Sequence, residues 1–452
     1  MSFINKMNFY TALLTAKSAN LGLHLFHHAG TSLPGALALK IQKNFIASVS
    51  DYCKKDIITV TGTNGKTTTA GLIAHIIKKT NCSVLHNEKG ANMLSGIASS
   101  LAVNYKPFSK FDYAVLESDE AYLTKLYDYL KADYLLVTNL FRDQLDRYGE
   151  LHTTAKKIQN AISKNPDLKV LLNADDPMVA GLGTGCKKIY FGFDEIIYDS
   201  AVPESQSPPE SVMCKCGSCM SYTKRYYAHI GNYFCSNCGN KRIQPDYTGR
   251  AVIFSDYTKI IVSHNERTNE FKTNLVGLYN AYNVLAAIAA ALEQKISPED
   301  IQSALESYQS VFGRAEKFML ENKHVLVQLI KNPTGASEVL RTINQETTAK
   351  LLIIINDNYA DGRDVSWLWD TDFEMLADYH NEIIVSGIRA DDMAVRLKYA
   401  GVNPKQITTV YDIKSAIKYA LKTLPEKSDG QLVIMPTYTA LLEMQHILNR
   451  KK

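Results

Sequence analysis

The sequence predicts an α/β protein in three parts: a short helical N-terminus, a large central domain with a cysteine-rich insertion, and a second α/β domain. Three observations support this prediction. Strand-like and helix-like segments alternate from about residue 57 to 190 and again from about 314 onwards, which is the pattern of parallel sheets covered by helices. A Pro- and Ser-rich segment at 201–211 interrupts the first run. Five of the eight cysteines follow that segment closely.

Length and composition fit two or three globular domains. With 452 residues, of which 46% are hydrophobic and 21% charged, the chain can bury several cores. The net charge of +4 is too small to indicate nucleic acid or a membrane by itself. No segment reaches the ~18 uninterrupted apolar residues of a membrane-spanning helix.

The expected boundaries follow the changes in pattern. Residues 1–45 form an N-terminal helical segment, 46–312 the central domain with an insertion at about 205–245, and 313–452 the C-terminal domain. Polar residues break the apolar stretch at 8–26, which has no clean signal-peptide core. We expect it to be a helix packed on the body of the protein. A helix that leans on a membrane is the alternative.

The strongest functional signal is the segment GTNGKTTT at 62–69. It joins a β-branched strand to an amphipathic helix, as a phosphate-binding loop does, although Val60 replaces the first glycine of the usual pattern. Loop N–H groups and the start of the helix can surround phosphate oxygens. Lys66 can reach the β- and γ-phosphates, and the Thr67 hydroxyl can hold Mg²⁺. The residues expected to bind ATP here are Gly62, Thr63, Asn64, Gly65, Lys66, Thr67 and Thr68.

This variant loop resembles that of the Mur ligase family, the ATP-dependent enzymes that build bacterial cell-wall peptides, and that of folylpolyglutamate synthase. Segments 137–150, 277–291 and 312–318 are similar to further motifs of the Mur ligases. The resemblance implies a Mur ligase-type ATP-binding central domain. It also implies that Glu117, at the end of a strand, binds Mg²⁺ and acts with Lys66 in catalysis.

The same resemblance implies that Asn280 and Arg314 contact ATP, since they lie in two of these motifs. One position departs from the family. Mur ligases usually carry Asp-His where this chain has Asp143-Gln144. Gln144 cannot serve as an imidazole ligand, so we do not expect a metal-binding imidazole at that position.

The cysteine-rich insertion predicts a structural zinc site. Cys235 and Cys238 form a C-x-x-C motif followed by glycine, which is typical of a zinc knuckle. A glycine follows Cys216 in the same way, so Cys216 is expected to end a second knuckle. The fourth ligand is Cys214 if Cys216 ends its knuckle. It is Cys219 if the first pair of ligands has C-x-x-C spacing. Four thiolates around one Zn²⁺ form a closed site, which braces the fold and does no chemistry.

A Mur-type core with a four-cysteine ribbon resembles the MurT family, the Mur ligase-like subunits of the lipid II isoglutaminyl synthases of Gram-positive bacteria. Segments 331–335, 356–370, 386–401 and 436–442 are also similar to this family. The resemblance implies a C-terminal domain of Rossmann-like α/β type. It further implies a heterodimer with a glutaminase of the GatD type. The chain would be cytoplasmic and act at the inner face of the membrane.

The activity implied is amidation of the α-carboxyl of D-glutamate in the lipid II stem peptide, which yields D-isoglutamine. ATP would convert the carboxylate to an acyl phosphate, and ammonia from the partner would displace the phosphate. Three scattered cysteines outside the insertion have no glutaminase motif around them, which agrees with a separate glutaminase.

The resemblance also implies that an aspartate of this chain completes a Cys-His pair in the partner. Asp357 is the expected residue because it follows a buried strand, at the carboxyl edge where functional groups gather in open α/β sheets. Asp361 and Asp364 remain alternatives within the same segment.

Two other functions are open to the sequence. The first is a stand-alone Mur-type or folylpolyglutamate-type ligase that adds an amino acid, against which the ribbon and the C-terminal motifs argue. The second is an ATP-binding scaffold that holds nucleic acid through the ribbon. The ribbon has few basic residues, so we expect no nucleic-acid partner.

Overall fold

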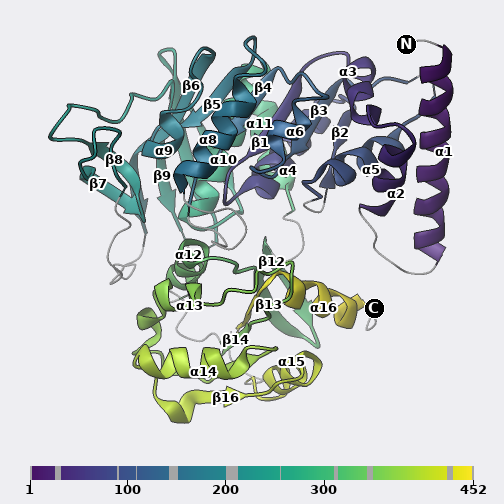
Figure 1. Ribbon diagram of the computed structural model, residues 1–452. Helices are drawn as coiled ribbons and strands as arrows, with labels where there is room; N and C mark the ends of the chain where they lie inside the picture. Colours follow the sequence, from purple (N-terminus) through teal and green to yellow (C-terminus); the bar gives the residue numbers. More distant parts are fainter. Residues whose placement is uncertain are drawn as a thin grey trace.

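Two α/β units and a small β-ribbon make up the molecule (Figure 1). The first unit contains a nine-stranded sheet, and the second contains a six-stranded sheet. Both are mostly parallel, which confirms the α/β class predicted from the alternating pattern. The computed structural model describes residues 3–25, 32–88, 91–107, 109–141, 151–199, 212–254, 256–309, 314–343, 350–424 and 431–449.

The nine-stranded sheet places β1 (Ile57–Thr61) between two parallel neighbours, β3 and β4. All five residues of β1 are buried, and two strands, β3 and β2, lie between it and one edge of the sheet. The strand order is β11-β10-β9-β6-β5-β4-β1-β3-β2, and only β9, β10 and β11 pair in antiparallel fashion. The other strands are β2 (Val84–His86), β3 (Tyr113–Glu117), β4 (Tyr134–Val137), β5 (Lys169–Asn173), β6 (Lys187–Tyr198), β9 (Tyr247–Ile253), β10 (Thr258–His264) and β11 (Arg267–Thr273).

Helices cover both faces of this sheet, and a hydrophobic core lies on each face. Successive residues of a strand point into these two cores alternately. In β1, Ile57 joins one core, whereas Ile58 and Val60 join the other, as the two-residue period of a strand requires. The core of Ile58 lies under α4 (Lys66–Lys79), α10 (Leu278–Glu293) and α11 (Pro298–Ser307). The opposite face carries α2 (Leu33–Ile41), α3 (Ser48–Tyr52), α5 (Leu94–Asn104), α6 (Leu123–Leu126), α8 (Leu151–Ile162), α9 (Pro177–Ala180) and the 3-10 turn η1 (Phe45–Ala47).

The N-terminal helix α1 (Phe3–Leu25) stands at the outer edge of the first unit, beside α2 and α5 (Figure 1). Phe9 fixes it there, because its ring stacks on Phe45 at 5.2 Å and on Tyr52 at 5.5 Å between centroids. Within the described residues, no helix is both long and apolar enough to cross a membrane.

The six-stranded sheet runs in the order β12-β13-β17-β14-β15-β16, and only β12 is antiparallel to its neighbour. Two hydrophobic cores lie on its two faces. The strands are β12 (Arg314–Leu320), β13 (Lys323–Gln328), β14 (Lys350–Ile354), β15 (Ile383–Ser386), β16 (Ile407–Thr409) and β17 (Gln431–Pro436). One face carries α12 (Pro333–Ile343), α13 (Trp367–Asp370), η3 (Phe373–Leu376) and α14 (Ala390–Tyr399), the other α15 (Ile413–Lys422) and α16 (Tyr438–Asn449), and η4 (Pro404–Gln406) precedes β16.

A buried carboxylate, Asp175, ties the inserted ribbon to the first unit. Its Oδ1 accepts a hydrogen bond from Nε of Arg242 at 2.6 Å, and its Oδ2 accepts from the Tyr282 hydroxyl and the Phe193 N–H, each at 2.7 Å. Its backbone carbonyl accepts from the N–H of Gly231, in the ribbon, at 2.9 Å. The ribbon strands are β7 (Ser221–Tyr227) and β8 (Ile230–Phe234).

Asp175→Asn should destabilise the protein strongly, because it leaves the almost fully buried Arg242 without its closest anion. Breaking a buried ion pair costs about 3–5 kcal/mol of unfolding free energy. Asp194→Asn is the matched control, since Asp194 also pairs with Arg242, at 3.2 Å, but is 43% exposed, and its loss should cost under about 1 kcal/mol. Urea unfolding of both variants measures the difference, and equal shifts in the midpoint would contradict the role given to Asp175.

Candidate active site and metal ribbon

The phosphate-binding loop follows β1, which lies between β4 and β3 in the first sheet. Gly62 and Gly65 have φ of 125° and 85°, in the left-handed region that favours glycine. A Cβ on Gly65 would lie 1.9 Å from Oδ1 of Asn283, so no larger residue fits. Helix α4 begins at Lys66 with Gly65 as its N-cap. A glycine cap has no side chain to bond the first-turn N–H groups, and such groups attract an anion to the start of a helix.

The residues after β4 hold the loop in place. The Asn64 N–H donates to Oδ1 of Asn139 at 2.9 Å, and Nδ2 of Asn139 donates back to the Asn64 carbonyl at 3.1 Å. The Thr138 hydroxyl donates to the same carbonyl at 2.8 Å, and the Thr63 N–H donates to the Asn139 carbonyl at 2.8 Å. The sequence analysis gave no role to Asn139, although its place two residues after a buried strand was a usable signal.

Lys66, which was expected to contact the phosphates, forms an ion pair with an acidic residue, Glu120. Its ammonium lies 3.2 Å from both carboxylate oxygens of Glu120 and also donates to the Gly62 and Thr63 carbonyls. Burial raises the pKa of the Glu120 carboxyl, and the Lys66 ammonium opposes part of that rise. Glu120 was not predicted. Its signal was a second acidic residue just beyond β3, near Glu117.

Thr67 and Glu117, the expected Mg²⁺ ligands, lie side by side. The Thr67 hydroxyl donates to Oε2 of Glu117 at 2.7 Å, and Nδ2 of Asn92 donates to Oε1 at 3.3 Å. The Glu117 N–H in turn donates to Oδ1 of Asn87 at 2.8 Å. A hydroxyl and a carboxylate are hard oxygen donors of the kind Mg²⁺ takes, together with water and phosphate oxygens. The donor set therefore fits this ion.

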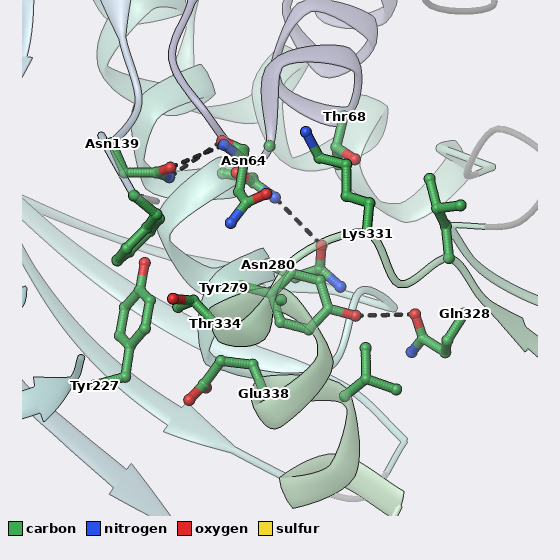
Figure 2. Close-up of a pocket in the computed structure, with 16 residues that line it drawn as sticks. Asn64, Thr68, Asn139, Tyr227, Tyr279, Asn280, Gln328, Lys331, Thr334 and Glu338 are labelled. Atoms are coloured by element: carbon green, nitrogen blue, oxygen red, sulfur yellow. Dashed lines mark hydrogen bonds between the residues drawn. The ribbon is translucent and has the colours of Figure 1, made fainter. Parts of the chain in front are cut away.

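A cleft of about 740 Å³, open to solvent, runs from the loop into the space between the two units (Figure 2). Half of its lining residues are aromatic or carry an amide side chain, and two are charged, Lys331 and Glu338, both from the second unit. Such a lining suits a flat heteroaromatic ring with polar edges. Besides loop residues, the walls include Asn139, Phe141, Tyr227, Tyr279, Asn280 and Gln328.

The second unit touches the loop directly through the segment after β13. Nδ2 of Asn332 donates to Oδ1 of Asn64 at 2.9 Å, and the reverse bond is 3.4 Å. The ammonium of Lys331 donates to the Thr63 carbonyl at 3.2 Å. The sequence marked this segment only by resemblance and assigned these two residues no role.

Two other residues expected at the ATP site lie near the cleft. Asn280 lines it from α10, and its Nδ2 donates to the Val276 carbonyl at 2.8 Å. The backbone of Arg314 begins β12 opposite Gln328, but its side chain lies outside the described part of the chain. Asp143 and Gln144 also lie outside the described residues.

Four of the five clustered cysteines form one group. The Sγ atoms of Cys214, Cys216, Cys235 and Cys238 all lie within 4.8 Å of one another. Tetrahedral Zn²⁺ with Zn–S distances of about 2.3 Å requires sulfurs nearly 4 Å apart, so these donors fit a zinc ion. Cys219 is outside the group, with its Sγ 3.5 Å from Sδ of Met213. The geometry thus favours the alternative with Cys214.

The two knuckles repeat one turn despite their unequal lengths. The Gly217 N–H donates to the Cys214 carbonyl at 2.9 Å, and the Gly239 N–H donates to the Cys235 carbonyl at 3.0 Å. Both glycines have positive φ. A backbone hydrogen bond from Ser218 lowers the pKa of the Cys216 thiol to about 5, which favours the thiolate that a metal requires.

The three candidate aspartates of the second unit differ in their contacts. Asp357 lies three residues after the end of β14 and is buried, and its Oδ2 accepts from Nη2 of Arg389 at 2.8 Å. Asp361 uses both carboxylate oxygens within its own chain, on Thr439 and on the Asn358 N–H. Asp364 is exposed and accepts from the Ser366 N–H at 2.8 Å. Asp361 therefore joins its own turn to Thr439, at the start of α16, and Asp364 holds a local turn.

Fold and loop together define a Mur ligase-type protein. Residues 60–291 match the Mur ligase middle domain, and residues 329–441 match the MurT ligase C-terminal region. Solved structures share the fold. A pseudomurein peptide ligase type C from Methanothermus fervidus gives a TM-score of 0.68 at 23% identity, over 88% of this chain and 79% of that one. Folylpolyglutamate synthase from Mycobacterium tuberculosis gives 0.60 at 13% identity, over 89% and 94%.

The particular family follows from the full-length relatives. The MurT subunit of lipid II isoglutaminyl synthase (glutamine-hydrolyzing) from Streptococcus pneumoniae R6 is 36% identical over 93% of this chain and 92% of its own length. That of Staphylococcus aureus COL is 36% identical over 98% of both. The chain belongs to the MurT family. This confirms the resemblance identified in the sequence and favours it over the folylpolyglutamate-type alternative.

One zinc ion per chain should be bound by the group with Cys214. Cys214→Ser should lose zinc and stability, because metal binding energy contributes to folding in a small ribbon. Cys219→Ser is the matched control and should keep both, since its thiol lies outside the group. Elemental analysis of protein purified without chelator measures this. Zinc lost from Cys219→Ser and kept in Cys214→Ser would reverse the assignment.

Glu338, which lines the cleft, makes the free energy of unfolding of the protein depend on pH. Burial raises the pKa of its carboxyl from 4.5 to about 7, with Arg341 opposing. Between these values the folded state binds the extra proton, so the free energy of unfolding falls as pH rises through this window. The slope is at most about 1.4 kcal/mol per pH unit.

Glu338→Gln should remove that slope, so its stability relative to wild type should rise from pH 4.5 to 7. Urea unfolding at several pH values measures it. Glu299→Gln, which changes an exposed glutamate in the first turn of α11, should leave the wild-type slope intact. A parallel pH profile for Glu338→Gln and wild type would contradict the burial of this carboxyl.

Proposed function

We propose that this chain is the ATP-dependent subunit of an amidotransferase that converts the α-carboxyl of D-glutamate in the lipid II stem peptide to an amide. The single observation that carries the proposal is the 36% identity, over nearly the whole of both chains, to MurT subunits of lipid II isoglutaminyl synthase. The geometry beside the phosphate-binding loop supports it, because the reaction needs a site for ATP that opens toward a second domain.

The proposed reaction has two steps that balance. A carboxylate oxygen of the substrate attacks the γ-phosphorus of ATP, ADP leaves, and an acyl phosphate forms. Ammonia then attacks the acyl carbon, phosphate leaves with the electron pair of the C–O bond, and the nitrogen loses a proton. The first step creates a good leaving group, since phosphate leaves far more readily than oxide.

The residues of this chain would stabilise charge on the transferred phosphoryl group. The loop N–H groups surround its oxygens, and Lys66 turns from Glu120 toward them. Mg²⁺, when bound by Thr67 and Glu117, supplies a further positive charge at the phosphates. Preorganised charges of this kind lower the barrier because they need no reorientation during the reaction.

The proposed partner is a glutaminase of the GatD type, which would release ammonia close to the acyl phosphate. We place its docking surface at the carboxyl edge of the six-stranded sheet. There the large side chains of Tyr359, Ile388 and Tyr411 are exposed around the buried Asp357. Aromatic residues are enriched at protein interfaces. Asp357 would orient a histidine of the partner. The complex would act in the cytoplasm, at the inner membrane face.

Two variants should separate the two half-reactions. Lys66→Ala should lose amidation by about 10³-fold, because a charge on the transferred phosphoryl group is lost. Asp357→Asn should lose only the glutamine-dependent reaction, since an asparagine cannot stabilise an imidazolium. High ammonium should restore amidation in Asp357→Asn and leave Lys66→Ala inactive. Mass spectrometry of lipid II incubated with ATP, the glutaminase and either nitrogen source measures both.

Asp364→Asn is the matched control, because Asp364 lies in the same segment but is exposed and bonds a backbone N–H. It should keep glutamine-dependent amidation. Rescue of Lys66→Ala by ammonium would contradict its role in phosphoryl transfer. Full glutamine-dependent activity in Asp357→Asn would contradict a catalytic group shared between the two chains.

A further inference from the structure

The outer face of α1 carries an apolar stripe made of Met7, Tyr10, Leu14 and Leu21. Three of these side chains recur every seven residues, and Met7, Leu14 and Leu21 are 60%, 66% and 64% exposed. Residues seven apart lie on the same side of a helix, so they form one line. The helix stands at the edge of the molecule with nothing drawn beyond it (Figure 1).

Folding of the chain does not account for this stripe. The opposite side of α1 is the one that packs on the first unit, through Phe9, Ala12, Leu13 and Ala16. Beside the stripe, the Thr11 hydroxyl donates to the carbonyl of Met7 at 3.0 Å, and the Lys17 ammonium donates to the Tyr105 carbonyl at 2.7 Å. Single exposed apolar residues are common, but four on one side of the same helix indicate an interaction surface.

Charge identifies the kind of surface that the stripe fits. The first 50 residues contain four lysines and no aspartate or glutamate, while the rest of the chain holds 46 basic and 46 acidic side chains. The whole formal excess of +4 therefore lies in the segment that carries the stripe. Lys40 and Lys43 are exposed at the end of α2, which packs beside α1.

We propose that the outer face of α1 lies on an anionic phospholipid bilayer. The four stripe side chains enter the headgroup region, and the exposed Lys40 and Lys43 face lipid phosphates. The proposed function enters this inference only as a reason for membrane binding, because its lipid-linked substrate lies in a bilayer surface. The docking surface given to the glutaminase is on the other unit, so both could be occupied together.

Flotation with vesicles tests the proposal on the full chain, without substrate or ATP. Wild-type protein should float with vesicles of phosphatidylglycerol and phosphatidylcholine, and binding should weaken at high salt because charge attraction is screened. It should float far less with phosphatidylcholine alone. The double variant Leu14→Glu, Leu21→Glu should partition at least about tenfold less.

Leu442→Glu is the matched control, because Leu442 is also an exposed helical leucine but lies on α16 of the second unit. It should float as wild type does. Unchanged zinc content and melting temperature would show that the double variant is folded. Equal flotation of wild type and double variant, or none by wild type, would overturn the proposal.

Light scattering and an amidation assay in detergent distinguish membrane binding from dimerisation and from failure of the proposed function. If light scattering gave a wild-type dimer that the double variant breaks, with no vesicle binding, the stripe would be an interface between two copies and the proposal would be wrong. Amidation of detergent-solubilised lipid II should be the same in wild type and double variant. Vesicle binding without any amidation in detergent would contradict the proposed function and leave this inference standing.

Discussion

The conformation of the phosphate-binding loop is the constraint on which the rest of the structure depends. Gly62 and Gly65 turn the chain in ways that favour glycine, and amide side chains from separate elements press against the turn. Asn139 holds it from the neighbouring strand, Asn283 lies against it from α10, and Asn332 reaches it from the second unit. One short segment is therefore contacted by the end of a neighbouring strand, by α10 and by the C-terminal unit.

The inserted ribbon contributes to the wall of the cleft. Its strand β7 ends at Tyr227, which forms part of the cleft wall, and Phe141 packs beside that ring at 5.5 Å between centroids. The four thiols precede β7 and follow β8, and Asp175 binds the ribbon through Arg242 and Gly231. A metal in the ribbon would thus stiffen one wall of the cleft without entering the chemistry. Glu338 closes the same cleft from the other unit.

Features with local signals could be predicted from the sequence, whereas those that depend on neighbouring strands could not. The α/β class, the loop and the cysteine pairs each follow from spacing over a few residues. Glu120 and Asn139 escaped prediction because strand order, which spacing does not encode, brings them to Lys66 and Asn64. The choice of Cys214 needed the repeated knuckle turn, because the C-x-x-C spacing alone suggested a different residue.

Oxygen exchange tests the central claim, activation of a carboxylate by phosphoryl transfer, most directly. Lipid II carrying oxygen-18 in the D-glutamate α-carboxyl would be incubated with this chain, ATP, Mg²⁺ and ammonium. The account predicts that one labelled oxygen appears in the released phosphate for each amide formed, because the acyl phosphate carries that oxygen away. Amide formation with unlabelled phosphate, or labelled phosphate formed without any amide, would contradict the account.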